Sequence, residues 1–155
     1  MPKTFPARDP MSSLPRLLVV DDEANHARVM AIGLRIEGFE VETAADAEGA
    51  MGLMRQAPFD LAIVDLMMPG TNGIQLTRMI REGFPRTQVV LTSAYHLSER
   101  QLVRADCGAV GFVPKPFDLT ELAAFLRAKL AYPDAGVGLE GGGGAGPFVA
   151  RGAAA

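Results

Sequence analysis

The sequence predicts an α/β protein with a doubly wound parallel sheet of five strands, (βα)5. Between Arg16 and Ala131, short apolar runs alternate with longer amphipathic segments, which is typical of repeated βα units. Three of the apolar runs finish beside charged residues: Asp21-Asp22, Asp65, and Lys115. Sites in parallel α/β sheets form just beyond the carboxyl ends of the strands, so we expect these charged groups to meet in one crevice.

The alternation of patterns places each element. Strands are expected near residues 16–20, 39–43, 60–64, 88–92 and 109–113, and helices near 24–37, 46–56, 73–82, 98–106 and 119–131. The strands near 16–20, 60–64 and 88–92 are almost wholly apolar, as expected where helices cover both faces of a sheet. The run 39–43 alternates apolar and charged residues, which predicts an edge strand.

Two helix starts carry capping-box spacing, Ser98 with Gln101 and Asp118 with Glu121. The last helix has an apolar stripe that we expect to face the core, with the basic Arg127 and Lys129 outside it. The stripe consists of Leu119, Leu122, Ala123, Leu126 and Leu130.

Composition limits the class of protein. The chain has 155 residues, 48% hydrophobic and 21% charged, as in an ordinary soluble protein with one domain. The net charge is −3 and basic residues do not cluster, so we expect no direct contact with nucleic acid or anionic membranes. The single Cys107 excludes an internal disulfide, fits a reducing compartment and favours a cytoplasmic location. No apolar run approaches the roughly 20 residues that span a bilayer.

The ends of the chain differ from its centre. Residues 1–15 lack the apolar region of a secretory signal and are expected to form a flexible extension before a domain at 16–131. Residues 132–155 are expected to form a flexible tail or linker, because 8 of the 17 glycines follow Pro133. These last 24 residues are too few for an output domain.

The chemistry of the site follows from Asp65. Taken alone, Asp21 and Asp22 are more simply interpreted as a solvated acidic turn before a helix. Asp65, however, follows four apolar residues, so its carboxylate is partly desolvated and needs a partner. Such a carboxylate can attack a phosphoryl group when a metal ion or an ammonium offsets the charge. Mg²⁺ and Lys115 are the natural candidates for that role.

The loop around Lys115 is restricted by prolines on both sides, and a cis Lys115-Pro116 bond would aim the lysine inward. A solvated surface lysine is the simpler alternative. At the end of the fourth strand, Thr92 and Ser93 each offer a hydroxyl that can donate to a phosphoryl oxygen.

Together these features resemble the receiver domain of bacterial two-component response regulators, over residues 16–131. The resemblance implies a flavodoxin-like fold of the chemotaxis type, with strand order 2-1-3-4-5. The matching features are Asp21-Asp22, the D-x-x-M-P-x-x-x-G run from Asp65 to Gly73, the strand-end hydroxyl and Lys115-Pro116.

The resemblance also implies roles for single residues. Asp65 would be the phosphoacceptor, Asp22 a direct Mg²⁺ ligand and Asp21 a ligand through water. Met67 would bind the ion through its main-chain carbonyl, and Lys115 would pair with the phosphoryl group.

A switch hydroxyl and a switch aromatic complete the family pattern. We choose Ser93 over Thr92 as the hydroxyl, because it lies 28 residues after Asp65 and 22 before Lys115. Phe112, three residues before Lys115, matches the aromatic, although an ordinary strand residue is an equally simple interpretation.

The resemblance implies a signalling role rather than an enzyme, apart from self-phosphorylation and autodephosphorylation. A sensor histidine kinase or phosphotransfer protein would donate the phosphoryl group. The surface formed by 98–106, 109–113 and 119–131 would then control a downstream effector or form a homodimer. We expect docking over Leu97, Arg100, Arg104 and Phe112.

Two other functions fit parts of the pattern. A pseudo-receiver would bind proteins without ever taking phosphate. A phosphatase of the haloacid dehalogenase type also uses a strand-end aspartate, but it needs a second aspartate where Met67 stands. His26 and His96 are expected to be surface residues.

Overall fold

The computed structural model of the chain describes residues 14–70, 72–94 and 107–131. The helix expected near 98–106, with its capping box at Ser98, lies outside these residues. The described strands are β1 (Arg16–Val20), β2 (Glu40–Ala44), β3 (Leu61–Asp65), β4 (Gln88–Ser93) and β5 (Gly111–Pro114). The described helices are α1 (Ala24–Ile36), α2 (Ala47–Gln56), α3 (Gly73–Gly83) and α5 (Leu119–Ala131).

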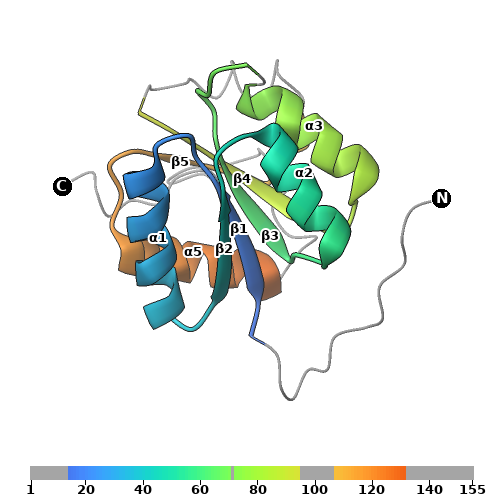
Figure 1. The fold of residues 1–155 in the computed structure, drawn as a ribbon. Coiled ribbons are helices and arrows are strands. Elements are labelled where there is room, and N and C mark those ends of the chain that lie inside the picture. The colour runs from blue at the N-terminus through green and yellow to red at the C-terminus, as the bar shows by residue number, and fades with distance from the viewer. Residues whose placement is uncertain (1–13, 71, 95–106, 132–155) are drawn as a thin grey trace, which may run out of the picture.

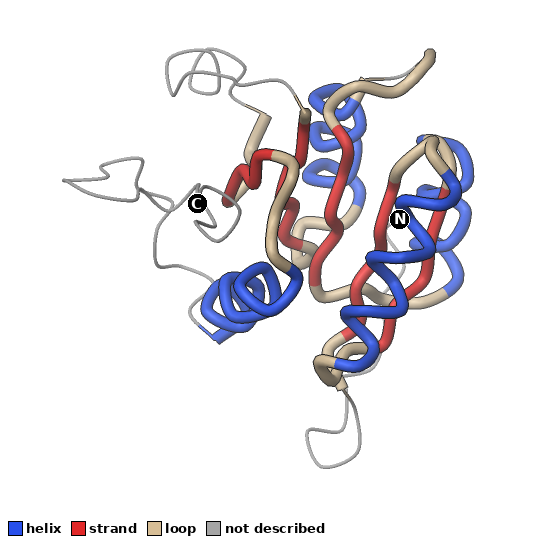
Figure 2. The backbone as a smooth tube through the Cα atoms, turned by 90° about the vertical axis from the view of Figure 1, so that its left-hand side faces the viewer, coloured by secondary structure: helices blue, strands red, loops and turns tan. Residues whose placement is uncertain are grey.

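The five strands form one parallel sheet in the order β2-β1-β3-β4-β5. Helices α1 and α5 cover one face, and α2 and α3 cover the other (Figure 1). Figure 2 shows the same chain turned by 90°, with the strands between the helices. The expected fold class and strand order are confirmed, and the alternating strand β2 lies at an edge of the sheet. The order changes direction at β1, which leaves a crevice at the carboxyl ends of β1 and β3.

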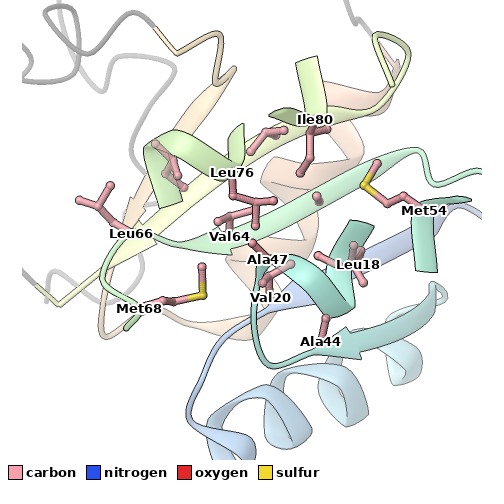
Figure 3. Close-up of a cluster of buried hydrophobic side chains, with 14 of the residues drawn as sticks. Leu18, Val20, Ala44, Ala47, Met54, Val64, Leu66, Met68, Leu76 and Ile80 are labelled. Carbon is pink, nitrogen blue, oxygen red and sulfur yellow. The ribbon is translucent and has the colours of Figure 1, made fainter. Parts of the chain in front are cut away.

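One apolar cluster lies between the sheet and helices α2 and α3 (Figure 3). Val20 and Val64 extend from β1 and β3 into this layer, where Met54 of α2 and Ile80 of α3 pack against the sheet. These side chains are at most 1% exposed, so each contributes about 1.5–3 kcal/mol of burial energy. This layer anchors the strands whose ends carry the charged residues.

The second cluster lies on the opposite face, under α1 and α5. It contains Val19 and Ile63 of the sheet, together with Leu34 of α1 and Leu126 of α5. Successive residues of β1 and β3 therefore enter different clusters, as the two-residue period of a strand requires. This explains why the runs are apolar at every position.

At the start of α5, the Asp118 carboxylate accepts a 3.0 Å hydrogen bond from the Glu121 N–H, which confirms the first of the two hydrogen bonds of the expected capping box. The expected exposure of Lys129 is wrong: this residue is only 7% exposed. Its Nζ lies 5.6 Å from the centroid of the Phe125 ring, and burial lowers the pKa of the amine. The long alkyl stem allows lysine to cover apolar surface where a helical stripe alone predicts solvent.

A capping box that we did not predict begins α3. The Asn72 side chain accepts a hydrogen bond of 2.9 Å from the Gln75 N–H, and the Gln75 side chain accepts one of 3.3 Å from the Asn72 N–H. The spacing of these two residues in the sequence is the signal that would have revealed it.

Candidate functional site

The strand register brings the ends of β1, β3 and β4 into line. Val20 pairs with Val64, and Asp65 pairs with Thr92. The residues that follow β1 therefore lie beside the last residue of β3. One ligand atom from each of Asp21, Asp22 and Asp65 lies within 4.8 Å of the others. The expected meeting of the acidic residues is confirmed.

Asp21 is held by hydrogen bonds on both of its carboxylate oxygens. Oδ1 accepts from the Glu23 N–H at 2.9 Å, and Oδ2 accepts from Lys115 Nζ at 3.2 Å and lies 2.5 Å from His26 Nδ1. Burial acts to raise the pKa of Asp21, but the Glu23 N–H, His26 and Lys115 together outweigh it and hold that pKa below its ordinary value. The Asp21 carboxylate is therefore ionised at neutral pH.

The burial of the Asp65 carboxylate is offset by fewer hydrogen bonds than that of the Asp21 carboxylate. Its Oδ1 accepts a hydrogen bond of 3.2 Å from the Met67 N–H, and its Oδ2 accepts one of 3.4 Å from Lys115 Nζ. Burial raises the pKa of Asp65, and the Met67 N–H and the charge of Lys115 offset that rise only in part. The neighbouring charge of Asp21 also raises the pKa of Asp65. A positive charge near these two carboxylates would offset the rise in the pKa of Asp65 that burial and the Asp21 charge cause.

Lys115 reaches the acidic residues from β5, at the opposite side of β4. The Lys115-Pro116 peptide bond is cis, which confirms the expectation for this loop. The Lys115 N–H donates to the Ser93 carbonyl at 2.8 Å, so the backbone of this residue is tied to the end of β4. Its side chain is 18% exposed and bridges Asp21 and Asp65. The alternative of a solvated surface lysine is wrong.

The donor set fits a hard divalent cation. Mg²⁺ is usually bound by one or two carboxylates together with waters and phosphate oxygens. Asp21 and Asp65 are buried and Asp22 is exposed, so the cluster has protein ligands on one side and open space for water on the other. Met67 is 55% exposed, and its backbone lies beside Asp65, because the Met67 N–H donates a hydrogen bond to the Asp65 carboxylate.

Both candidate switch hydroxyls are buried, Thr92 at 2% and Ser93 at 0% exposure. Thr92 pairs with Asp65 across the sheet, whereas Ser93 pairs with Pro114 next to Lys115. Both residues are therefore beside the site, and the choice of Ser93 stays a prediction.

Phe112 is 4% exposed and packs in the cluster under α2 and α3, so its expected place on a docking surface is wrong in this structure. Side chains alternate between the two faces of a strand, and the position of Phe112 in β5 turns its ring toward the core. The other residues expected in docking, Leu97, Arg100 and Arg104, lie outside the described residues.

His26 is the site residue that our sequence reasoning missed. We expected a surface residue, but its side chain is 30% exposed and contacts the buried Asp21 carboxylate. Its ring also packs edge-on against Phe117, with centroids 6.2 Å apart. The available signal is its position near the start of α1, one helical turn after the loop that carries Asp21. His96 lies outside the described residues.

Comparison with protein families gives one match that spans most of the chain. A model of the response regulator receiver domain matches residues 17–127. This range begins at the second residue of β1, contains the other four described strands and includes the residues of the acidic cluster.

Curated relatives are similar over the same part of the chain. The regulatory protein AtoC of Escherichia coli (strain K12) is 34% identical over 120 residues, which are 77% of this chain and 26% of that protein. The DNA-binding response regulator MtrA of Mycobacterium tuberculosis (strain ATCC 25618 / H37Rv) is 37% identical over 121 residues, which are 77% of this chain and 52% of that protein. The chain thus spans about half of MtrA and a quarter of AtoC.

Solved structures share the fold. A CheY-like response regulator receiver domain protein from Methanospirillum hungatei JF-1 has a TM-score of 0.71 and 28% identity, and the alignment covers 77% of this chain and 95% of that one. The response regulator TrrA from Thermotoga maritima, solved in complex with Mg(2+)-BeF, has a TM-score of 0.67 and 32% identity, with 76% and 99% covered.

Proposed function

The chain belongs to the response regulator receiver domain family, and from this membership we propose that it accepts a phosphoryl group on Asp65 in two-component signalling. The observation that carries the proposal is the position of Lys115 Nζ, 3.2 Å from Asp21 and 3.4 Å from Asp65 beside the three-carboxylate cluster. A nucleophilic carboxylate next to an ammonium and a metal site is what phosphoryl transfer to aspartate requires.

In the proposed reaction an Asp65 carboxylate oxygen attacks the phosphorus of a phosphohistidine. A P–O bond to Asp65 forms, the P–N bond of the donor breaks, and its electron pair stays on the imidazole, which takes up a proton. Lys115 already contacts Asp65, so its ammonium is placed to pair with a phosphoryl oxygen as charge moves to that side. A sensor histidine kinase or a phosphotransfer protein supplies the donor, in the cytoplasm.

The acidic cluster would hold Mg²⁺ through Asp21, Asp22, Asp65 and the Met67 carbonyl. Bound magnesium supplies positive charge that neutralises phosphoryl oxygens. The choice of magnesium is supported by the hard oxygen donors of the cluster and by the Mg(2+)-BeF complex of the Thermotoga relative. Beyond gaining and losing this phosphoryl group, the domain catalyses no reaction in our proposal.

Output would follow from a shift between two conformations that the phosphoryl group favours unequally. We propose that Ser93 moves toward the phosphoryl group and that Phe112, already buried, stabilises the altered packing of β5. The surface that includes β5 and α5 then binds an effector protein or a second copy of the chain. The net charge of −3 favours a protein target over direct binding to nucleic acid.

The proposal is tested by intact mass spectrometry after incubation with Mg²⁺ and acetyl phosphate. We expect one labile phosphoryl group on the native chain and none on an Asp65→Ala variant. Asp60→Ala is the matched control, because Asp60 precedes β3 at the opposite end of the same strand and should leave phosphorylation intact.

A native chain that binds Mg²⁺ but gains no phosphoryl group would overturn the proposal in favour of a pseudo-receiver. Phosphorylation of Asp65→Ala to the native extent would move the acceptor to another residue. Steady hydrolysis of a generic phosphate ester would instead indicate a phosphatase.

Met67 provides a prediction about the lifetime of the phosphorylated state. Its side chain is 55% exposed, next to the Asp65 carboxylate, and is too apolar to orient an attacking water. We expect Met67→Asn to lose its phosphoryl group several-fold faster in a dephosphorylation time course. Met79→Asn is the control, since Met79 is 40% exposed on α3. An unchanged or slower rate for Met67→Asn would contradict a shielding role.

A further inference from the structure

His26 extends the acidic cluster by one residue on the side of α1. Its Nδ1 lies 2.5 Å from Asp21 Oδ2, the same oxygen that accepts from Lys115 Nζ. Because an ionised carboxylate only accepts hydrogen bonds, the imidazole must donate its Nδ1–H to Asp21. A chain of contacts thus runs from His26 through Asp21 and Lys115 to Asp65.

These contacts occupy specific acceptor sites of the Asp21 carboxylate. Each carboxylate oxygen has about two lone pairs. His26 and Lys115 use both sites of Oδ2, whereas the Glu23 N–H uses one site of Oδ1. The remaining site on Oδ1 is then the one available to a metal ion or to its bound water. His26 therefore helps to decide which oxygen of Asp21 faces the cluster.

The ring of His26 is itself held in place. Phe117 packs edge-on against it at 6.2 Å with an interplanar angle of 67°, and Phe117 lies two residues after Lys115. The imidazole is thus packed between helix α1 and the loop that carries the lysine. A side chain held in this way can keep its hydrogen bond to Asp21 when a neighbouring group moves.

We infer that His26 is a positioning residue for the Asp21 carboxylate, which keeps that carboxylate oriented for Mg²⁺ when Lys115 turns to the phosphoryl group. This inference rests on the proposed function. When Lys115 moves toward a phosphoryl oxygen, its contact with Asp21 weakens, and His26 then remains as the second side-chain donor on Oδ2 of this buried carboxylate. Hydrogen-bonded partners of metal ligands commonly change metal affinity by about 10–100-fold when removed.

The experiment measures Mg²⁺ binding by isothermal titration calorimetry at constant neutral pH. His26→Leu and His26→Ala remove the donor, and each should weaken Mg²⁺ binding by about 10-fold. His26→Asn places an amide donor near the position of Nδ1 and should restore most of the affinity. Asn25→Leu, at the exposed neighbouring position of α1, should bind Mg²⁺ like the native chain. Thermal unfolding followed by circular dichroism shows which variants are folded. Because two variants lack the donor, the test still works if one of them fails to fold.

The outcomes separate this inference from the proposed function. Native affinity in His26→Leu or His26→Ala overturns the inference while leaving phosphorylation of Asp65 intact. An equal loss in His26→Asn and His26→Leu also overturns it, because the ring packing rather than the donor would then be responsible. A native chain that neither binds Mg²⁺ nor takes a phosphoryl group overturns both.

Discussion

Replacement of Lys115 by methionine should slow phosphorylation of Asp65 by about 10²-fold or more, the usual cost of losing one positioned charge in a transition state. The Lys115 ammonium lies 3.2 Å from Asp21 and 3.4 Å from Asp65, in a loop where it is 18% exposed. Without it, two buried carboxylates face each other and the incoming phosphoryl oxygens lose their protein cation. Methionine is also unbranched and is only one atom shorter than lysine, so the loss is mainly one of charge.

The same variant should change the pH dependence of the reaction. Lys115 now lowers the pKa of Asp65, against the larger effect of burial, so its removal raises that pKa further. In the proposed reaction the ionised carboxylate is the nucleophile, and protonation removes it as pH falls. The pH at half-maximal rate should therefore move upward in Lys115→Met. Initial rates of phosphoryl incorporation, followed by intact mass with saturating Mg²⁺ across the acidic to neutral range, measure this shift.

Lys129→Met is the matched control, because it makes the same substitution at the other end of the sheet. Lys129 lies on α5, where its carbonyl accepts a hydrogen bond of 3.1 Å from the side chain of Gln88, the first residue of β4. The rate and its pH profile should remain native there. Equal rates for Lys115→Met and the native chain would remove Lys115 from the reaction.

Gly73→Ala should lower the free energy of unfolding by roughly 2–3 kcal/mol, as expected for overpacking against atoms that cannot easily move. An added Cβ would lie 2.6 Å from the Asp65 carbonyl oxygen and 2.7 Å from Leu66 Cα. Both are backbone atoms at the end of β3. The Gly73 N–H also donates to the Leu66 carbonyl at 2.9 Å, which holds the start of α3 against this strand.

The clash should also affect function, because the displaced peptide carries Asp65. We expect reduced phosphorylation in the folded fraction of Gly73→Ala, in addition to a lower midpoint of urea unfolding. Gly52→Ala is the control: Gly52 is inside α2 with no atom within 4 Å of an added Cβ. That variant should gain up to about 1 kcal/mol from helix propensity. Native stability in Gly73→Ala would show that the loop can move away without cost.

Most of the architecture was predictable because it depends on the periodicity of the sequence. All five strands were expected within two residues of their observed starts, and the described helices were expected within one residue. The starts of β2, β3 and β5 were placed early, and for β2 and β5 the reason is that apolar residues extend beyond the hydrogen-bonded part of the strand. Phe39, for example, is 3% exposed and packs in the core, but β2 begins at Glu40. Apolar patterns report burial, whereas strand bounds depend on pairing.

The acidic residues and the lysine were also predictable, since parallel strands place their carboxyl ends at one edge of a sheet. Their roles came from resemblance to a family and not from the spacing alone. His26 and Lys129 were wrongly placed, because each was judged by its own helix. His26 is half-buried through contacts with Asp21 and Phe117, and Lys129 is buried on α5 beside the Phe125 ring.

The order of apolar and polar residues along this chain was sufficient to specify its strands, its described helices and the charged residues at the strand ends. Such patterns act over a few residues, and they follow from the repeat of the helix and the strand. Tertiary packing decided the partners: which oxygen of Asp21 each donor occupies, that Lys115 bridges two carboxylates, and that Phe112 faces the core. Those contacts join residues from separate elements, so their burial and their pKa values depend on distances that no local pattern contains.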